Sequence, residues 1–193
     1  MKKPKAKERI LETASQLFHE RGYSEVGVNE IIDKAETAKA TFYQHFPSKE
    51  SLCGAWLQLV HDRSEAHRQQ ILEGGGSPAS MVDAYFQDLG RFMEQSEFRG
   101  CPYSNTGAVI DDDCSCLRQQ IEEHKACIRE FFRVLAIRMT EDQARGEELG
   151  DVLFLLFSGA TIEAQNLKDL WPVEAARKSA RELCERASAV SVT

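Results

Sequence analysis

Apolar residues recur every three to four positions along almost the whole chain. A helix brings residues i, i+3, i+4 and i+7 to one face, whereas a half-buried strand alternates apolar and polar residues. No stretch of four to eight residues shows such an alternation. The pattern therefore predicts an all-α protein.

Three short segments with helical spacing fill the first 46 residues. A first helix is predicted over residues 5–21, and a short second one over the apolar positions between residues 28 and 35. A third helix, residues 38–45, turns Phe42 and Phe46 towards the interior. Because the second and third helices are only a few residues apart, the three match a helix-turn-helix, whose last helix enters the DNA major groove.

A longer helix follows, and after it comes the clearest break in the chain. Ser48 is a favourable N-terminal cap, so a fourth helix is predicted over residues 48–72. The segment EGGGSPAS at residues 73–80 combines glycine, proline and serine, which indicates a loop. We therefore expect an N-terminal domain of residues 1–47, a connecting helix of residues 48–72 and a C-terminal domain of residues 73–193.

The C-terminal part carries further helical stripes. Two amphipathic helices are predicted from their inward-facing residues, which are Val82, Tyr85, Phe86, Leu89 and Phe92 in one and Leu117, Ile121, Ile128, Phe131, Phe132 and Leu135 in the other. Residues 149–167 are apolar on nearly all faces, which predicts a helix buried on all sides. Pro172 opens a last helix, whose row of alanines permits close packing.

Composition narrows the class of protein. The 193 residues are 42% hydrophobic and 28% charged, as in ordinary soluble globular domains. No run approaches the roughly 20 apolar residues that a membrane-spanning helix needs, and no apolar segment follows the basic N-terminus as in a signal peptide. We expect a cytoplasmic protein that does not bind membranes.

Charge is shared unevenly between the two parts of the chain. The formal net charge is −7, which argues against general binding of polyanions. Residues 1–72 carry a net charge of +1, whereas residues 73–193 carry −8. Only the N-terminal part is therefore a candidate for a surface that binds a polyanion.

The cysteines are not expected to stabilise the fold through disulfide bonds or a metal ion. The chain holds six cysteines, Cys53, Cys101, Cys114, Cys116, Cys127 and Cys184. In a cytoplasmic protein they are expected to stay reduced. Cys116 and Cys127 lie about 16 Å apart along one predicted helix, too far to share a metal ion. His124 and Cys127 are close enough, but further ligands would have to come from elsewhere, so we expect no metal site and no cofactor.

The segment AETAKATFYQHFPSKESL, residues 35–52, together with the preceding helices, carries a recognisable pattern of residues. Its members are Ile10, Ala14, Leu17, Phe18, Gly22, Tyr23, Val28, Ile31, Ala35, Lys39, Thr41, Phe42, Tyr43, His45, Phe46, Ser48, Lys49, Glu50 and Leu52. At this spacing the pattern resembles the N-terminal domain of the TetR/AcrR family of transcriptional regulators. The resemblance covers about the first 55 residues and implies a homodimeric regulator, most often a repressor, that binds double-stranded DNA.

The resemblance also implies which residues meet the DNA. Family members contact phosphates or the groove at positions that correspond to Lys39, Thr41, Tyr43 and Lys49, and His45 falls where the family packs or contacts the backbone. Hydroxyl groups and lysine ammonium groups are suited to phosphate contacts, which position the protein without reading sequence. Base reading is expected from Thr37, Ala38, Lys39, Ala40 and Gln44.

Two departures from the family pattern lie in this segment. The usual Ala-Gly-Val of the turn is replaced by Ala35, Glu36 and Thr37, and Ala40 stands where glycine usually precedes the threonine. Glu36 lacks the freedom of glycine to adopt a positive φ. Gly27 stands where a serine or threonine cap is usual, a small loss because glycine is tolerated there.

For the C-terminal part, the resemblance implies a domain that binds a small-molecule effector and dimerises through the last two helices, about 147–168 and 172–188. The candidate effector-binding residues are Tyr85, Phe86, Phe92, Cys101, Tyr103 and Phe131, with Met93 and Trp171 as further pocket candidates. Aromatic residues at helical spacing are, however, more often simply part of the core. The candidate dimer contacts are Phe154, Phe157, Gly159, Ala160, Ile162 and Leu183, for each of which a role in the core alone is the alternative.

Cys101 raises a separate hypothesis. The segment around Gly100 and Cys101 resembles one found in part of the family, and in some of these relatives the cysteine senses electrophiles or oxidants. The alternatives are a buried structural thiol and, more remotely, an enzyme that uses Cys101 or a histidine. No spacing of nucleophile, base and orienting residue supports the enzyme.

Overall fold

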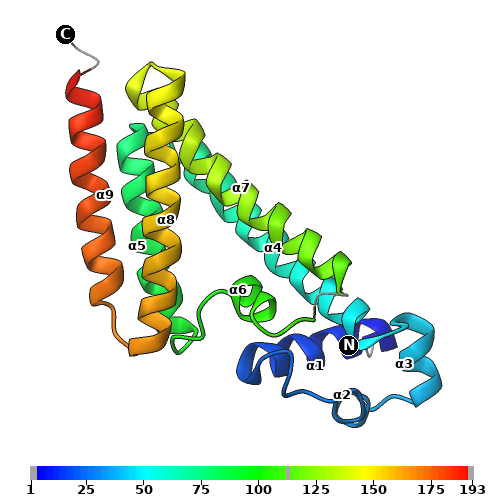
Figure 1. Ribbon diagram of the computed structural model, residues 1–193. Helices are drawn as coiled ribbons and strands as arrows, with labels where there is room; N and C mark the ends of the chain where they lie inside the picture. The colour runs from blue at the N-terminus through cyan, green and yellow to red at the C-terminus, as the bar shows by residue number, and fades with distance from the viewer. Residues whose placement is uncertain (1–3, 112–113, 191–193) are drawn as a thin grey trace. The chain divides into compact units, whose positions relative to one another are not determined.

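The computed structural model describes residues 4–111 and 114–190, and within these ranges all regular structure is helical (Figure 1). The ends of the two predicted domains, residues 1–3 and 191–193, lie outside the described part. The helices are α1 (Ala6–Arg21), α2 (Val28–Lys34), α3 (Lys39–His45), α4 (Lys49–Glu73), α5 (Pro78–Gln95), α6 (Pro102–Gly107), α7 (Ser115–Thr140), α8 (Gln143–Leu167) and α9 (Trp171–Val190). The predicted all-α class is confirmed, and the four N-terminal helices begin and end within a residue of the predicted limits where these were given.

The chain forms two compact units that are not contiguous in sequence. The first contains Met1–Arg63 and Pro102–Glu123, and the second contains Ser64–Cys101 and His124–Thr193. The predicted division at residues 47 and 73 differs from this grouping. Helices α4 and α7 are each continuous and long, and each contributes one part to the first unit and the other part to the second.

The first unit is organised around buried residues of α1 and the beginning of α4. The Phe18 ring of α1 lies 5.4 Å from the Trp56 ring of α4, between ring centroids. Phe42 and Phe46 are buried as predicted, with their centroids 6.3 Å apart. Burial of these aromatic side chains fixes which face of α3 is left for solvent.

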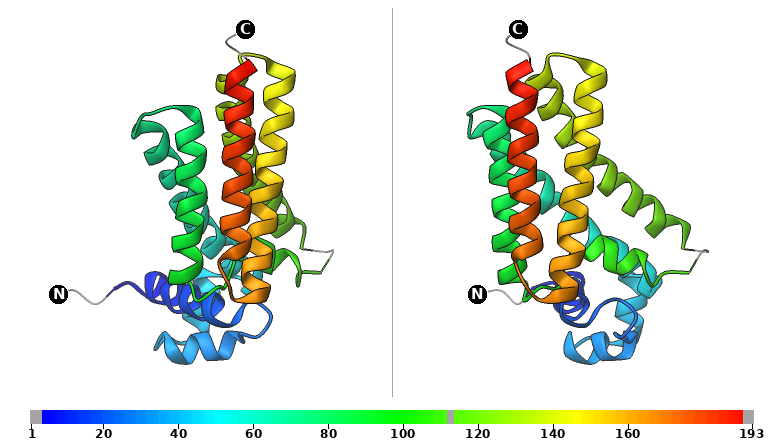
Figure 2. Two further views of the ribbon diagram at one scale, coloured as in Figure 1. Left: turned by 90° about the vertical axis from the view of Figure 1, so that its left-hand side faces the viewer. Right: turned by 60° about the vertical axis from the view of Figure 1, so that its left-hand side comes forward.

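In the second unit, α5, α8 and α9 lie side by side (Figure 2). An aromatic cluster fills the core, and Tyr85 of α5 is near its centre. The Tyr85 ring stacks on Phe157 of α8 at 4.8 Å, and it lies 4.8 Å from Phe131 of α7. Arg177 of α9 donates two hydrogen bonds of 2.7 Å to Asp83 of α5, which ties these two helices together.

Helices α7 and α8 approach each other closely because α8 presents two glycines to α7. A Cβ atom added at Gly146 would lie 2.5 Å from the Cα of Ile137, and one added at Gly150 would lie 2.5 Å from the Cα of Arg133. These distances leave no room for a side chain at either position.

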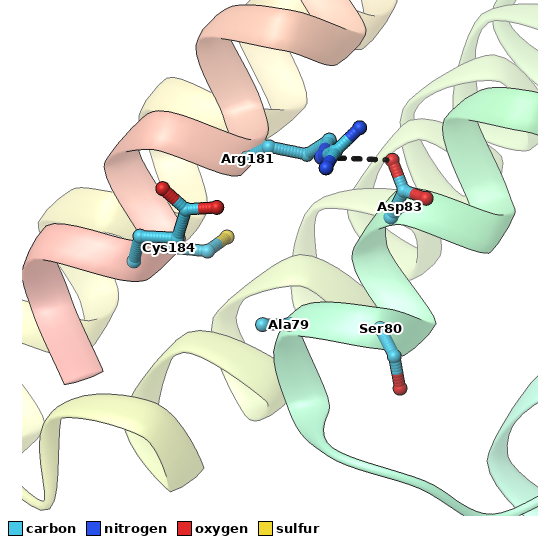
Figure 3. Close-up of a pocket in the computed structure, with 6 residues that line it drawn as sticks. Ala79, Ser80, Asp83, Arg181 and Cys184 are labelled. Carbon is cyan, nitrogen blue, oxygen red and sulfur yellow. Dashed lines mark ion pairs between the residues drawn. The ribbon is translucent and has the colours of Figure 1, made fainter.

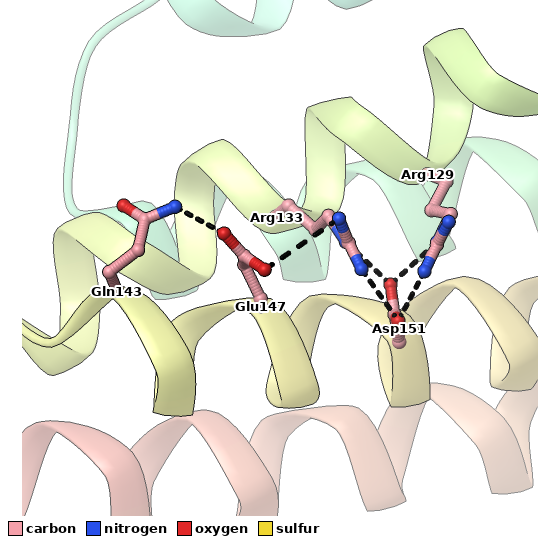
Figure 4. A network of polar contacts seen from close by, with 5 residues as sticks. All are labelled: Arg129, Arg133, Gln143, Glu147 and Asp151. Atoms are coloured by element: carbon pink, nitrogen blue, oxygen red, sulfur yellow. Dashed lines mark hydrogen bonds and ion pairs between the residues drawn. The ribbon is translucent and has the colours of Figure 1, made fainter.

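Two arginines of α7 hold the same face of α8. Arg129 and Arg133 each donate two hydrogen bonds to Asp151 at 2.6–2.9 Å, as Figure 4 shows. The paired guanidinium groups keep the pKa of Asp151 far below its ordinary value. Glu147, which accepts from Gln143 and lies near Arg133, extends the network along α8.

Two expectations about the C-terminal helices are wrong. Phe92 is 40% exposed, whereas its neighbour Met93 is completely buried, because residue 93 rather than 92 continues the stripe of residues 82, 86 and 89. Residues 149–167 are not buried on all sides within the chain, since Leu155 is 65% exposed.

Within residues 4–111 and 114–190, no helix is both long and apolar enough to span a bilayer.

Candidate functional site

The turn between α2 and α3 positions the third helix through its backbone. Thr37 donates its N–H to the carbonyl of Ile32, and Glu36 donates to that of Asp33, both at 3.1 Å. This pair of bonds is a Schellman motif, in which the residue at the Glu36 position is left-handed and is usually glycine. Glu36 has φ of 48°. It therefore adopts the left-handed backbone conformation, although a glutamate has less freedom than glycine to do so.

Arg9 of α1 holds this turn in place. Its Nε donates to the carbonyl of Ala35 at 3.1 Å, and one terminal nitrogen donates to the carbonyl of Glu36 at 3.2 Å. Sequence reasoning missed Arg9, because its partners are more than 25 residues away and are backbone atoms. The side chain ties α1 to the turn that sets the direction of α3.

The exposed face of α3 carries most of the predicted DNA-contacting residues. Ala38, Lys39, Ala40, Tyr43 and Gln44 are exposed, while Thr37, Thr41 and His45 are half-buried. The buried Phe42 and Phe46 lie on the opposite face, so the short helix separates packing residues from those that remain free to meet a partner.

The start of α4 lies next in the chain and carries the last of these residues. Ser48 and Ser51 cap the helix reciprocally, since the N–H of each donates to the hydroxyl of the other at 3.1 and 3.0 Å. Lys49 places its ammonium group 4.4 Å from the centre of the Tyr23 ring and 3.4 Å from the carbonyl oxygen of Ser24. Partial burial lowers the pKa of Lys49. The capped N-terminus provides the positive end of a helix dipole, which favours anions.

The predicted effector-binding residues are only partly brought together. Tyr85, Phe86 and Phe131 share the aromatic core of the second unit, and Cys101 belongs to the same unit. Tyr103 instead belongs to the first unit, where its hydroxyl donates to the carbonyl of Leu57 at 2.6 Å. Two further candidates, Phe92 and Trp171, are exposed.

Arg68 of α4 is a polar residue of this core that sequence reasoning missed. Its side chain is almost completely buried, and it donates to the hydroxyl of Ser64 at 2.7 Å and to the carboxylate of Glu65 at 2.5 Å. The Tyr85 hydroxyl lies close to both Arg68 and Ser64, and burial raises its pKa. The helical spacing of residues 57, 64, 68 and 71 was the signal that would have placed Arg68 on the inward face.

Cys101 is half-buried and lies beside a lysine of α7. Lys125 places its ammonium nitrogen 3.7 Å from the Cys101 sulfur. The preceding Gly100 has φ of 72°, and a Cβ atom there would lie 2.0 Å from an oxygen of Gln165. The positive φ favours glycine at this point, and the Gln165 side chain would have to move to admit a Cβ atom.

The predicted dimer contacts divide into two groups. Phe157 and Ala160 pack within the chain, in or against the core of the second unit, and Phe154 and Leu183 are partly buried. Gly159 and Ile162 are exposed on α8. Helical spacing adds two exposed apolar residues to the same face, Val152 and Leu155, which sequence reasoning missed because it treated the helix as buried all round.

A shallow hollow of about 270 Å³ lies between α5 and α9 (Figure 3). It is lined by Ala79, Ser80, Asp83, Arg181, Cys184 and Glu185. Asp83 is already held by Arg177, and burial raises the pKa of the Cys184 thiol to about 11. Across residues 4–111 and 114–190, no three His, Cys, Asp or Glu side chains come together as a metal site would require.

Comparison with known proteins agrees with this geometry. The family described as "Bacterial regulatory proteins, tetR family" matches residues 10–55. The HTH-type transcriptional repressor NemR of Escherichia coli (strain K12) is 26% identical over 175 residues, covering 87% of this chain and 88% of that protein. The HTH-type transcriptional regulator LmrA of Bacillus subtilis (strain 168) is 26% identical over 176 residues, covering 87% and 90%.

Solved structures show the same fold. The TetR-family regulator SCO4454 from Streptomyces coelicolor superposes with a TM-score of 0.81 at 22% identity, covering 97% of this chain and 96% of that one. The reduced form of E. coli NemR gives a TM-score of 0.77 at 22% identity, with 92% and 95% covered.

The fold and the exposed face of α3 define a helix-turn-helix DNA-binding protein of the transcription-regulator class. Within that class, the N-terminal domain of the chain belongs to the TetR family.

Proposed function

We propose that the protein is a ligand-responsive repressor that binds a palindromic DNA operator as a homodimer and is released by a small-molecule effector. The observation that carries this proposal is the exposed polar face of α3, on which Lys39, Tyr43 and Gln44 are exposed while Phe42 and Phe46 are buried on the opposite face. The hydroxyl and ammonium groups contact phosphates, and Gln44 with Thr37 and Ala40 reads base edges. The capped start of α4 receives a further phosphate beside Lys49.

Helix α4 provides the coupling between effector and DNA. It begins at Lys49 in the first unit and continues without interruption past Arg68 in the second. An effector that shifts the α4 segment around Arg68 changes the separation of the two recognition helices of the dimer. Effector and operator then favour different conformations, and each weakens the binding of the other by the same factor.

Dimerisation takes place through the exposed apolar face of α8, which consists of Val152, Leu155, Gly159 and Ile162. A Cβ atom added at Gly159 would meet nothing within 4 Å, so the chain itself leaves this position open for close approach. A self-complementary face gives two-fold symmetry, and two-fold symmetry gives a palindromic site.

The test is selection of bound sequences from a random pool of double-stranded DNA by the purified full-length protein. We expect enrichment of a palindrome whose half-sites are about one helical turn apart or slightly more. Failure to enrich any sequence over repeated rounds would contradict the proposal. A tandem, non-palindromic site would contradict the two-fold dimer while leaving DNA binding in place.

A second candidate function is sensing of electrophiles or oxidants by the Cys101 thiol on the same frame. The observation that favours it is the 3.7 Å contact between Lys125 and the Cys101 sulfur, because a neighbouring ammonium group stabilises a thiolate. Alkylation of Cys101 with N-ethylmaleimide is expected to weaken operator binding in the wild type and not in Cys101→Ser. Unchanged operator binding after complete alkylation would eliminate this function.

A further inference from the structure

Arg68 is buried to an extent that is unusual for a charged residue. It is 2% exposed, and among the described residues no other Lys, Arg, Asp or Glu is classed as buried. A buried guanidinium group is costly unless anions or hydrogen-bond acceptors surround it. The groups that contact Arg68 therefore indicate which chemical group this guanidinium can bind.

One of these partners comes from the solvent side. Glu65 lies one helical turn before Arg68, and its side chain is 54% exposed although its carboxylate contacts the buried guanidinium group. The other two partners, the hydroxyls of Ser64 and Tyr85, are neutral. Among the described residues, the carboxylate that contacts Arg68 thus belongs to a largely exposed side chain that reaches inward.

The surroundings of this ion pair are aromatic. The ring of Tyr85 is nearly parallel to that of Phe157, with 16° between the planes, and His67 stacks on Tyr85 at 5.8 Å and 22°. Phe131 closes the cluster at 4.8 Å from Tyr85. Aromatic rings therefore surround Tyr85, whose hydroxyl lies close to Arg68. The fork-shaped donor of Arg68 matches a carboxylate in two-point geometry.

We infer that Arg68 is the anchor for a carboxylate group of the effector, and that Glu65 occupies the anchor in the absence of effector. The ligand class is an aromatic carboxylic acid, whose ring takes the place of the partly exposed His67 ring on Tyr85 and whose carboxylate displaces that of Glu65. This inference rests on the proposed function, since it names the chemistry of the effector. Arg68 lies on α4, so exchange of its partner acts on the helix that also carries Lys49.

The alternative is a purely structural role, in which Arg68 holds Ser64 and Tyr85 together without binding ligands. The effect of Glu65 on ligand binding distinguishes this structural role from the ligand-binding role. As a competitor, Glu65 weakens the binding of an anionic ligand. As a structural partner, it has no such effect. Glu65→Gln removes the competing charge and leaves Arg68 in place, while Glu73→Gln makes the same change at the exposed end of α4, five residues beyond Arg68.

The experiment is calorimetric titration of the full-length protein, without DNA, with benzoate, 1-naphthoate and biphenyl-4-carboxylate, each beside its neutral amide. We expect the wild type to bind at least one carboxylate roughly tenfold or more tightly than its amide, as charge-assisted hydrogen bonds provide. Arg68→Gln removes this preference, and Glu65→Gln tightens carboxylate binding about threefold or more, whereas Glu73→Gln leaves it unchanged.

Two results would overturn the inference. One is a wild type that prefers none of the three carboxylates over its amide. The other is equal carboxylate affinity in Glu65→Gln and Glu73→Gln, a comparison that remains valid even if Arg68→Gln does not fold. The operator selection is independent of this titration. DNA binding without carboxylate preference rejects only the anchor, and carboxylate preference without operator enrichment rejects only the repressor.

Discussion

Glu36 stands at a backbone position that suits glycine better. Its positive φ is imposed by the Schellman bonds at the end of α2, and a side chain in this region costs about 1–2 kcal/mol. Arg9 offsets part of this cost by donating to the carbonyl groups on both sides of the Glu36 Cα atom, those of Ala35 and Glu36. The residue that departs from the family pattern is therefore accommodated by a specific partner on α1.

Replacing Glu36 by glycine should stabilise the protein by roughly 0.5–1 kcal/mol, because relief of the strained φ exceeds the entropy that glycine adds to the unfolded chain. Urea unfolding followed by circular dichroism measures the difference. The matched control is Glu36→Ala, which removes the same charge and retains the strained Cβ, and it should gain little. Equal stabilisation by both variants would assign the effect to charge instead of backbone conformation.

Lys39 and Lys49 are predicted to contribute phosphate contacts. On the selected operator, Lys49→Ala should reduce the slope of log K against log salt by about 0.9 for each half-site, and weaken mutated operators by the same factor as the intact one. Tyr43→Phe should also weaken all operators alike. Lys178→Ala, on the exposed face of α9, serves as the control for overall charge. Loss of sequence preference in Lys49→Ala would contradict a role confined to phosphate.

Among the helices, α7 and α8 depend on close approach, and α5 and α9 depend on an ion pair. Gly146 and Gly150 let the backbones of α7 and α8 come together, and the guanidinium groups of Arg129 and Arg133 then reach Asp151. Packing and charge thus act on the same pair of helices.

Gly150→Ala should destabilise the protein by roughly 3 kcal/mol, because the new methyl group would meet the backbone of α7, which has no flexible side-chain end to move aside. Thermal unfolding measures the loss. Glu148→Ala, at an exposed position two residues earlier in α8, should leave stability nearly unchanged. Tolerance of alanine at residue 150 would show that the two helices are farther apart than described.

The ion pair between Asp83 and Arg177 should make the stability of the protein depend on pH, with stability falling at acidic pH. Hydrogen bonds from Arg177 lower its pKa below the ordinary 3.8, so the ion pair adds stability at neutral pH that is lost as pH falls through the folded-state pKa. Asp83→Asn should cost roughly 1 kcal/mol at pH 7, the upper range for a partly exposed pair. Unfolding titrations should show this difference shrinking below about pH 4. A constant difference down to pH 2 would point to lost packing.

At the scale of the whole molecule, the main feature is the apolar face of α8, which is exposed to solvent in the described part of a single chain. Leu155 is its most exposed large residue, and Val152 and Ile162 lie one or two helical turns away on the same face. Exposed apolar stripes of this kind mark protein interfaces. The dimer proposed above would cover them.

Leu155→Glu should therefore convert the dimer to a monomer, since two carboxylates would face each other near the symmetry axis. Analytical ultracentrifugation measures the mass in solution, and circular dichroism verifies that the helices remain. Gln87→Glu introduces the same charge at an exposed position of α5 and should stay dimeric. A variant at residue 155 that remains dimeric would place the interface elsewhere.

The sequence by itself determined the helical class, the bounds of the N-terminal helices and the separation of Phe42 and Phe46 from the exposed residues of α3. These are local properties, because a 3.6-residue period and a cap residue act within one or two turns. The tertiary structure alone decided that Glu36 adopts a positive φ, that Phe157 packs inside the chain and that Arg68 is buried. A helical pattern identifies an apolar face, but what covers that face depends on residues far away in the chain.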